Sequence, residues 1–200
     1  MSTEKHPFPP FLPEGARILF LGSFPPQPHR WCMPFYYPNW INDFWRIMGL
    51  IHFGNKEHFC VAGEKRFDEA AIRQFCADAG LAFYDTACEV RRLRDNASDA
   101  FLEVVKPTDI PSLLARIPQC ELLVTTGEKA STIVAETFGC PIPPIGGSSV
   151  ISTKADFVHC HFDQAQRVEK SLTFYRMPST SRAYPLPLEK KADAYRRLFQ

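Results

Sequence analysis

The segment Ser23–Trp40 carries the side chains best suited to chemistry in this sequence. It reads SFPPQPHRWCMPFYYPNW and follows Arg17–Gly22, a short apolar run typical of a buried strand. Each proline fixes one backbone angle, so the loop is stiff, and Tyr36 and Tyr37 stand in its second half. Flat rings, amides and hydroxyls on a rigid loop can stack on a flat, neutral ring and hydrogen-bond its edge. The alternative is that these aromatic residues belong to the core, as most aromatic clusters do.

Two other loops supply hydroxyl groups. The sequence MPSTSRAY places Ser179, Thr180 and Ser181 after an apolar run. Residues 126–129, Thr-Gly-Glu-Lys, lie between a predicted strand and a predicted helix, and form either a weak anion site or simply a tight turn. The sequence lacks the glycine patterns of phosphate and dinucleotide loops, and the Gly-x-Ser-x-Gly of a nucleophile elbow. No pair of carboxylates stands out, because the acidic residues lie mainly on predicted helix faces.

Alternating strands and helices predict how these loops are positioned. The predicted strands are 17–22, 81–84, 121–126 and 172–176, and the predicted helices are 41–50, 64–79, 108–117, 128–138 and one that begins at residue 188. This order predicts an α/β fold, a three-layer α/β/α sandwich with a central, mainly parallel four-stranded sheet. Ligands bind at the carboxyl ends of such strands, which selects the loops 22–40, 85–98, 126–129 and 177–184. We expect one domain over residues 1–200, with 1–16 as a Pro-rich arm pinned by Phe8 and Phe11.

Composition narrows the classes of protein that fit. Hydrophobic residues make up 45% and charged residues 22%, which excludes disorder for the chain as a whole. Lys and Arg number 23 against 22 Asp and Glu, so a polybasic protein that holds nucleic acid by bulk charge is excluded, whereas a local basic face is not. The candidates for such a face are His29, Arg30, Arg91, Arg92, Arg94 and Arg182, although 91–101 also reads as an ordinary exposed loop.

The seven cysteines form no C-x-x-C pair, which favours reduced thiols used as small hydrophobic residues. His159, Cys160 and His161 alternate along a predicted strand, but two ligands on one face are not a zinc site. We therefore expect no metal site. The first residues lack the apolar stretch of a signal peptide, and no run of 18 apolar residues occurs, so we expect a cytoplasmic protein without a membrane anchor. We also expect a monomer.

Four segments resemble the uracil-DNA glycosylase superfamily, and most closely its hypoxanthine-DNA (deoxyinosine) glycosylase branch. The run ILFLGSFPP followed by FYYPNWINDFWRIMG is similar to that branch's first motif, and YRMPSTSRAY is similar to its L-P-S-T-S-P-A loop. Between them, YDTACEVRR and LLVTTGEKA fall where the family has strands ending in Trp-Asp-Val and Asn-Gly-Lys-Lys-Ala. The resemblance is collinear from about residue 16 to residue 184.

The resemblance implies an activity and a role for individual residues. The family hydrolyses the N-glycosidic bond of an aberrant base flipped out of DNA and leaves an abasic site, without metal or cofactor. Asn42 matches the essential asparagine of the first motif, which positions the attacking water or the sugar. Base-binding positions are Gly22, Ser23, Phe24, Tyr36, Tyr37 and Thr126. DNA-binding positions are Ser179, Thr180, Ser181 and Arg182, to which the basic loop adds Arg91 and Arg92.

The sequence departs from the family pattern at four places. Phe24 stands where many members have a carboxylate or amide, Trp40-Ile41 replaces Pro-Arg, Thr126 replaces an asparagine that reads the base edge, and Met177 stands where the uracil enzymes have His. Three hypotheses follow. The first is an active glycosylase on uracil, hypoxanthine or a related deaminated base. The second is a superfamily member with altered or lost catalysis that binds nucleic acid or a nucleotide, and the third is an unrelated α/β enzyme such as a hydrolase that uses Cys32.

Overall fold

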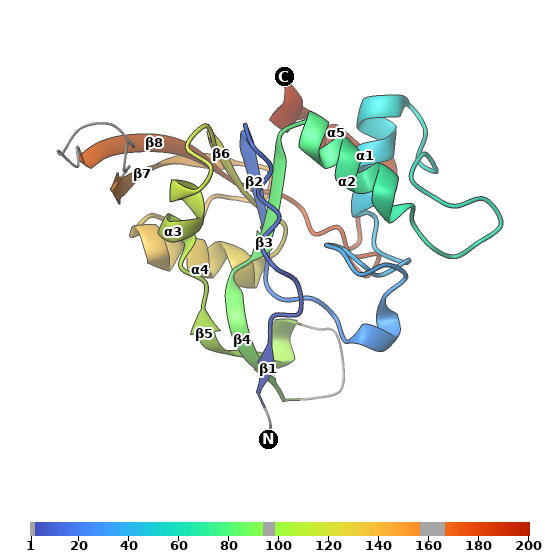
Figure 1. Cartoon of the computed structure of the whole chain (residues 1–200), viewed down its shortest axis with the longest axis horizontal. Helices are drawn as coiled ribbons and strands as arrows, with labels where there is room; N and C mark the ends of the chain where they lie inside the picture. Colours follow the sequence, from blue (N-terminus) through green and yellow to red (C-terminus); the bar gives the residue numbers. More distant parts are fainter. Residues whose placement is uncertain (1–2, 94–98, 157–166) are drawn as a thin grey trace.

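The main sheet runs through the middle of the molecule (Figure 1). The computed structural model describes residues 3–93, 99–156 and 167–200. The sheet has the order β3-β2-β6-β8-β7, with β2 at Ile18–Gly22, β3 at Leu81–Asp85, β6 at Leu122–Thr125, β7 at Ser148–Asp156 and β8 at Arg167–Arg176. The first four strands of this order are parallel, as predicted, and β7 pairs with β8 in the antiparallel direction. The sheet thus has one strand more than predicted, because the polar alternation of β7 hid it in the sequence.

The strand register brings the predicted loops to one edge of the sheet. Gly22 pairs with Asp85, and Thr125 pairs with Arg176, so β2, β3, β6 and β8 end at the same level. The apolar strands β2 and β3 are buried on both faces, as parallel strands between helical layers must be.

Helices cover both faces of this sheet (Figure 1). Helices α1 (Phe44–Phe53), α2 (Glu69–Asp78) and α5 (Leu188–Arg196) lie on one side, and α3 (Ile110–Ala115) and α4 (Glu128–Phe138) on the other. The three-layer prediction is therefore confirmed, and so are the bounds of α4.

Three helices begin later than their apolar spacing predicted. Residues 39–42 form a hydrogen-bonded turn, so α1 starts only at Phe44. Asp68 caps α2 by accepting a bond from the Ala71 N–H. Helix α3 is capped by Asp109 and not by Thr108, because the Thr108 hydroxyl donates instead to the carbonyl of Asp85. In each case the hydrogen bonds of polar side chains decide where the helix begins.

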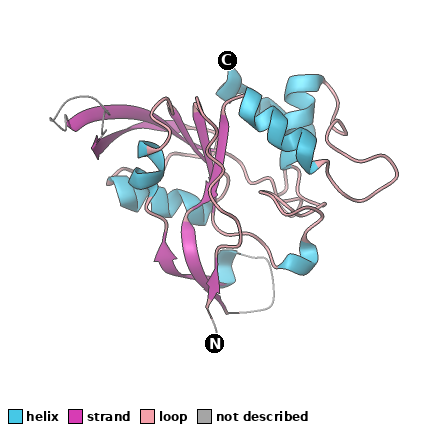
Figure 2. Cartoon of the chain, viewed as in Figure 1, coloured by secondary structure: helices cyan, strands magenta, loops and turns pink. Residues whose placement is uncertain are grey.

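A second, three-stranded sheet lies at one end of the main sheet (Figure 2). It consists of β1 (Glu4–Lys5), β4 (Ala87–Arg92) and β5 (Leu102–Pro107), all antiparallel. The prediction of an exposed loop from Arg91 was wrong at its start, because Arg91 and Arg92 are strand residues. Arg94 and the motif at 159–161 lie outside the described residues.

The Pro-rich arm is fixed to the body, as predicted. Phe11 exchanges two backbone hydrogen bonds with Phe83, at 3.0 and 2.8 Å, and Phe8 is buried. The excess of Phe is largely core: Phe20 and Phe83 are stacked with ring centroids 5.4 Å apart, and Phe44 packs edge-on against Phe20. No helix in the described parts of the chain has the length and apolar character needed to span a membrane.

Candidate active site

A cavity of about 630 Å³ lies at the carboxyl ends of β2, β3, β6 and β8. It is lined by loops that are far apart in the sequence and that the strand register brings together. Among its lining residues are Gly22, Ser23, Phe24, Tyr36, Tyr37, Asn42, Thr126, Ser179, Thr180, Ser181 and Arg182. These are all of the candidate site residues except Arg91 and Arg92, so the residues selected from three separate segments share one cavity.

Asn42 is held at the start of α1 in a defined orientation. Its Oδ1 atom accepts a hydrogen bond from the Phe44 N–H at 2.9 Å, and its own N–H donates to the carbonyl of Asn39 at 2.8 Å. A backbone N–H can bond only to the oxygen of the carboxamide, which fixes which atom is Oδ1. The Nδ2 group is therefore the end of the side chain that is left to donate to a ligand.

Tyr37 has an unusual backbone and a fixed ring. Its φ of 51° is the one positive value of a non-glycine residue among the described parts of the chain. Such a conformation costs roughly 1–3 kcal/mol and persists where packing enforces it. The ring lies flat on Phe44, with centroids 3.9 Å apart, and its hydroxyl is 3.0 Å from the Thr126 Oγ1 atom. Burial raises the pKa of Tyr37, so the phenol stays protonated and neutral.

Tyr36 contacts the N-terminal arm and also lines the cavity. Its hydroxyl donates to the carbonyl of Pro9 at 2.9 Å, and its ring packs against Phe83. The hydroxyl is thus committed to the protein, and only the ring remains for contact with a ligand.

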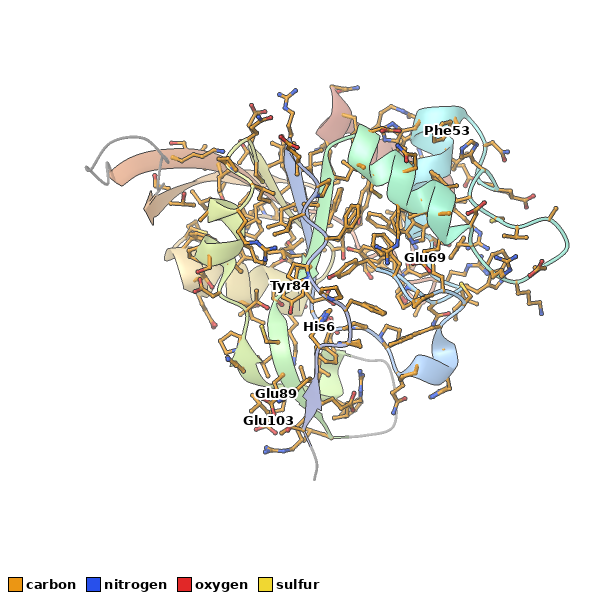
Figure 3. The ribbon with its side chains drawn as sticks, in the orientation of Figure 1. His6, Phe53, Glu69, Tyr84, Glu89 and Glu103 are labelled. Carbon is orange, nitrogen blue, oxygen red and sulfur yellow. The ribbon has the colours of Figure 1, made fainter. Side chains whose placement is uncertain are left out.

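Two carboxylates, Asp85 and Asp99, line the same cavity, although no pair of carboxylates stands out in the sequence. Asp85 ends β3, directly beside Gly22. Its Oδ2 atom lies 2.8 Å from Nε2 of His6, whose Nδ1 atom is 2.8 Å from the Phe8 carbonyl oxygen. An ionised carboxylate only accepts hydrogen bonds, so the Nε2–H of the buried His6 donates to Asp85 and orients it. His6 and Tyr84 lie side by side at this end of β3 (Figure 3), with centroids 4.6 Å apart.

The second carboxylate, Asp99, accepts a hydrogen bond of 2.5 Å from the Ser23 hydroxyl. Burial raises the pKa of Asp99 above its ordinary value, although the Ser23 bond and the nearby Lys129 act in the opposite direction. Asp99 follows a polar segment whose composition is typical of an exposed loop, so the local sequence does not predict that Asp99 lines a cavity. Asp85 did carry a signal, since it directly follows an apolar strand predicted to lie in the parallel sheet.

Gly22 is required for the position of Asp85. A Cβ atom added at Gly22 would lie 2.5 Å from Asp85 Oδ1, whereas one added at Gly127 would meet its first neighbour, Asp99 Oδ2, at 3.6 Å. We expect Gly22→Ala to destabilise the protein by about 1–3 kcal/mol, as overpacking does, and Gly127→Ala to change stability little. Urea unfolding of both variants checks this. Equal stability of Gly22→Ala and wild type would mean that Asp85 moves aside freely.

The raised pKa of Asp99 predicts a pH-dependent stability. A carboxyl whose pKa is higher in the folded state favours folding below its unfolded pKa, and this contribution is lost as pH rises through the folded value. We expect Asp99→Asn to raise Tm at pH 7 and to have a smaller effect at pH 4, because Asn can still accept from Ser23. Thermal melts across this pH range test it. Asp109→Asn is the control: hydrogen bonds from Ser112 lower the pKa of Asp109, so no gain at pH 7 is expected there.

A buried ion pair connects residues 179–181, the Ser-Thr-Ser loop, to α1 and α5. Nζ of Lys191, whose side chain is 1% exposed, lies 2.8 Å from both Asp43 Oδ2 and the carbonyl oxygen of Ser181. The Asp43 N–H donates to the Thr180 carbonyl at 2.9 Å, and Nε of Arg182 lies 3.2 Å from Asp43 Oδ1. The loop therefore has a fixed position relative to Asn42, the residue before Asp43.

The remaining basic candidates are divided between the cavity and the small sheet. Arg30 lines the cavity. Arg91 pairs with Glu103 at 2.9 Å, and neither it nor Arg92 lines the cavity. Arg92 pairs with Glu4 at 3.0 Å and donates to the Pro25 carbonyl, so it supports the loop from behind.

Cys32 has the wrong environment for a nucleophile. Burial raises the pKa of its thiol, whereas reactive cysteines have a lowered pKa, and its Sγ atom donates to the Pro38 carbonyl. Cys76 and Cys120 are fully buried, in keeping with their use as small hydrophobic residues. The described residues contain no group of three or more His, Cys, Asp or Glu side chains that could hold a metal ion.

Comparison with known proteins supports the fold. No protein-family model matches the chain, and no curated protein matches it. Among solved structures, it is similar to the solution structure of a protein from Methanosarcina acetivorans described as a "putative Uracil DNA glycosylase". The TM-score is 0.59 and the sequence identity 19%, over 100% of each chain. The chain thus has an α/β fold, with a mixed sheet flanked by helices, like that of this uracil-DNA glycosylase-like structure.

Proposed function

We propose that the chain is a monofunctional DNA glycosylase. It hydrolyses the N-glycosidic bond of a deaminated base, uracil or hypoxanthine, flipped out of DNA, and leaves an abasic site. The observation that carries the proposal is the convergence of Asn42, Tyr37 and Ser179 on one cavity. The fold likeness to the glycosylase-like structure supports it. We further propose that residues 1–200 act as one domain, without metal or cofactor, in the cytoplasm.

The cavity has the size and lining that a flipped nucleotide needs. Small-molecule sites enclose about 300–1,000 Å³, and this one encloses about 630 Å³. The ring of Tyr37, which the buried Phe44 supports from behind, is part of its lining next to the hydrogen-bonding Thr126. Extruding a base costs a few kcal/mol, of which stacking on an aromatic side chain returns about 1–3 kcal/mol.

The cavity is lined by both a neutral amide, Asn42, and a carboxylate, Asp85, and hydrolysis of an N-glycosidic bond can use both. In the transition state the sugar becomes cationic and the departing base becomes anionic. Neutral hydrogen-bond donors near the base stabilise this negative charge. We propose this role for Nδ2 of Asn42, in place of the positioning of water or sugar that the resemblance implies, because Oδ1 is already bonded to the Phe44 N–H. In the proposed reaction the Asp85 carboxylate, which His6 orients, stabilises the sugar cation and takes a proton from the attacking water. The water oxygen bonds to C1′ as the N-glycosidic electron pair leaves with the base.

Base release from DNA tests the proposal. We expect wild-type protein, in molar excess, to cleave at least one of three oligonucleotides that carry uracil, hypoxanthine or xanthine, each leaving alkali-labile abasic DNA. Absence of product from all three would refute the proposal for these bases. If the same oligonucleotides were then bound but not cleaved, a nucleic-acid-binding protein without catalysis would be the better description.

The same assay separates the cysteine hydrolase from the glycosylase. Because the Cys32 thiol is not activated, we expect its alkylation to leave base release unchanged. Inactivation by alkylation that is absent in Cys32→Ser would instead favour a cysteine-dependent enzyme.

A further inference from the structure

Asp99 lines the cavity with one carboxyl oxygen bound by the protein and the other left over. Its Oδ1 atom accepts the 2.5 Å hydrogen bond from the Ser23 hydroxyl, and in the described parts of the chain this is the one hydrogen-bond partner of the carboxyl group. The other carboxylate of the cavity, Asp85, is paired with His6 instead. The Oδ2 atom of Asp99 is therefore the carboxylate oxygen that can accept a hydrogen bond from a ligand.

The negative charge of Asp99 is poorly compensated. Among the described residues no cation forms an ion pair with it, because Lys129 donates to a backbone carbonyl and Arg92 is paired with Glu4. Burial raises the pKa of Asp99, and the nearby Asp85 acts in the same direction. A partly buried carboxylate with an unfilled acceptor is costly, and a donor on a bound ligand would reduce that cost.

Asp99 lies beside the part of the cavity where the aromatic ring meets Thr126. The ring of Tyr37 has Phe44 behind it, and its hydroxyl is 3.0 Å from the Thr126 Oγ1 atom. Gly127 follows Thr126, and a Cβ atom added there would meet Oδ2 of Asp99 at 3.6 Å. A flat base on the Tyr37 ring would therefore have Thr126 and Asp99 beside the same edge. Because the Thr126 hydroxyl is already bonded to Tyr37, Asp99 is the stronger acceptor at that edge.

We propose that Asp99 selects the base: its Oδ2 atom accepts a hydrogen bond from the ring N–H that lies beside a carbonyl in uracil and in hypoxanthine. This inference rests on the proposed function. Cytosine and adenine, from which these bases derive by deamination, have a ring nitrogen with a lone pair at that position, and it would face the carboxylate without a hydrogen. One carboxylate thus recognises a deaminated pyrimidine and a deaminated purine alike. It also supplies an edge contact that Thr126, which stands in place of the family's asparagine, can make through only one hydroxyl.

Binding of uncleavable analogues tests this contact without base release. Duplexes carry a 2′-fluoro nucleotide with either hypoxanthine or purine, which is the same ring system without the carbonyl and the N–H, and Kd is measured for both. We expect wild type to bind hypoxanthine more tightly, and Asp99→Leu to lose about 10–100-fold of this preference, the range for a hydrogen bond to a charged group. In Asp99→Asn the amide oxygen stays with Ser23 and Nδ2 faces the base, so the preference should move toward purine, whose ring nitrogen accepts.

A duplex with a tetrahydrofuran abasic site is the control for folding and for contacts with the DNA backbone, and every variant should bind it as wild type does. Asp78→Asn, on α2 and outside the lining of the cavity, should keep the wild-type preference. A wild-type preference in both Asp99 variants would overturn the inference, and so would equal binding of the two analogues by wild type. If wild type prefers hypoxanthine through Asp99 but releases no base, the proposed catalysis fails while the base contact stands.

Discussion

Asn42→Ala is expected to lower the single-turnover rate of base release by about 10²–10³-fold, as the loss of one transition-state donor does in other enzymes. The reason lies in the orientation of the carboxamide. Oδ1 already accepts from the Phe44 N–H at 2.9 Å, so the donating Nδ2 group is the part that remains for the substrate. The rate is measured with enzyme in excess over DNA, and Kd is measured with an uncleavable analogue. We expect the loss to fall on the rate and not on Kd.

Two further variants separate this role from a structural one. Asn42→Asp keeps an oxygen that caps α1 but has no N–H, so we expect it to be as slow as Asn42→Ala while unfolding no more readily than wild type. Asn55→Ala removes an Oδ1 atom that accepts from the Glu57 N–H at 2.9 Å, with the same spacing but away from the cavity, and should leave the rate unchanged. Wild-type activity in Asn42→Asp would show that Asn42 acts through its oxygen, on the attacking water.

Asp85→Asn is expected to slow base release by about 10²–10⁴-fold, the range for a positioned acid or base. The substitution keeps the size of the side chain and an oxygen that can accept from His6 at Nε2, but removes the negative charge beside the developing sugar cation. DNA binding should be unchanged or tighter, because one anion is removed from a site that receives phosphates. Rate and Kd measured together make this distinction.

The control for Asp85 is an exposed carboxylate, Asp78, on α2. Asp78→Asn should leave both rate and Kd unchanged. If Asp85→Asn releases base as fast as wild type, the carboxylate has no part in catalysis, and Asp99 becomes the residue to substitute next. A fall in DNA affinity with an unchanged rate would instead assign Asp85 to base recognition.

Sequence patterns were most informative where a local rule decides the structure. Four apolar strands, each followed by a helix, predicted the parallel core of the sheet, and the start and end of α4 were predicted correctly. The stiff aromatic loop and the Ser-Thr-Ser loop were placed at strand ends, and the rule that parallel strands end at one edge predicted that they would meet. Both loops line the same cavity.

Local sequence patterns could not predict contacts between residues that are distant in the chain. The antiparallel β7 and the small sheet of β1, β4 and β5 are polar and irregular, and they form because partner strands satisfy their backbone groups. His6 and Asp85 are 79 residues apart, and Asp43 and Lys191 are 148 residues apart. No spacing rule relates such residues.

The stiffness and the aromatic side chains of the loop 23–40 were determined by the sequence alone, because proline, aromatic and amide side chains limit what a loop can do. The charges around that loop were decided by the tertiary structure. Asp85 and Asp99 line the cavity because neighbouring strands and turns bring them there. Lys191 reaches Asp43 because α1 and α5 pack together. A charge interacts according to distance in space and burial, and neither is fixed by position along the chain.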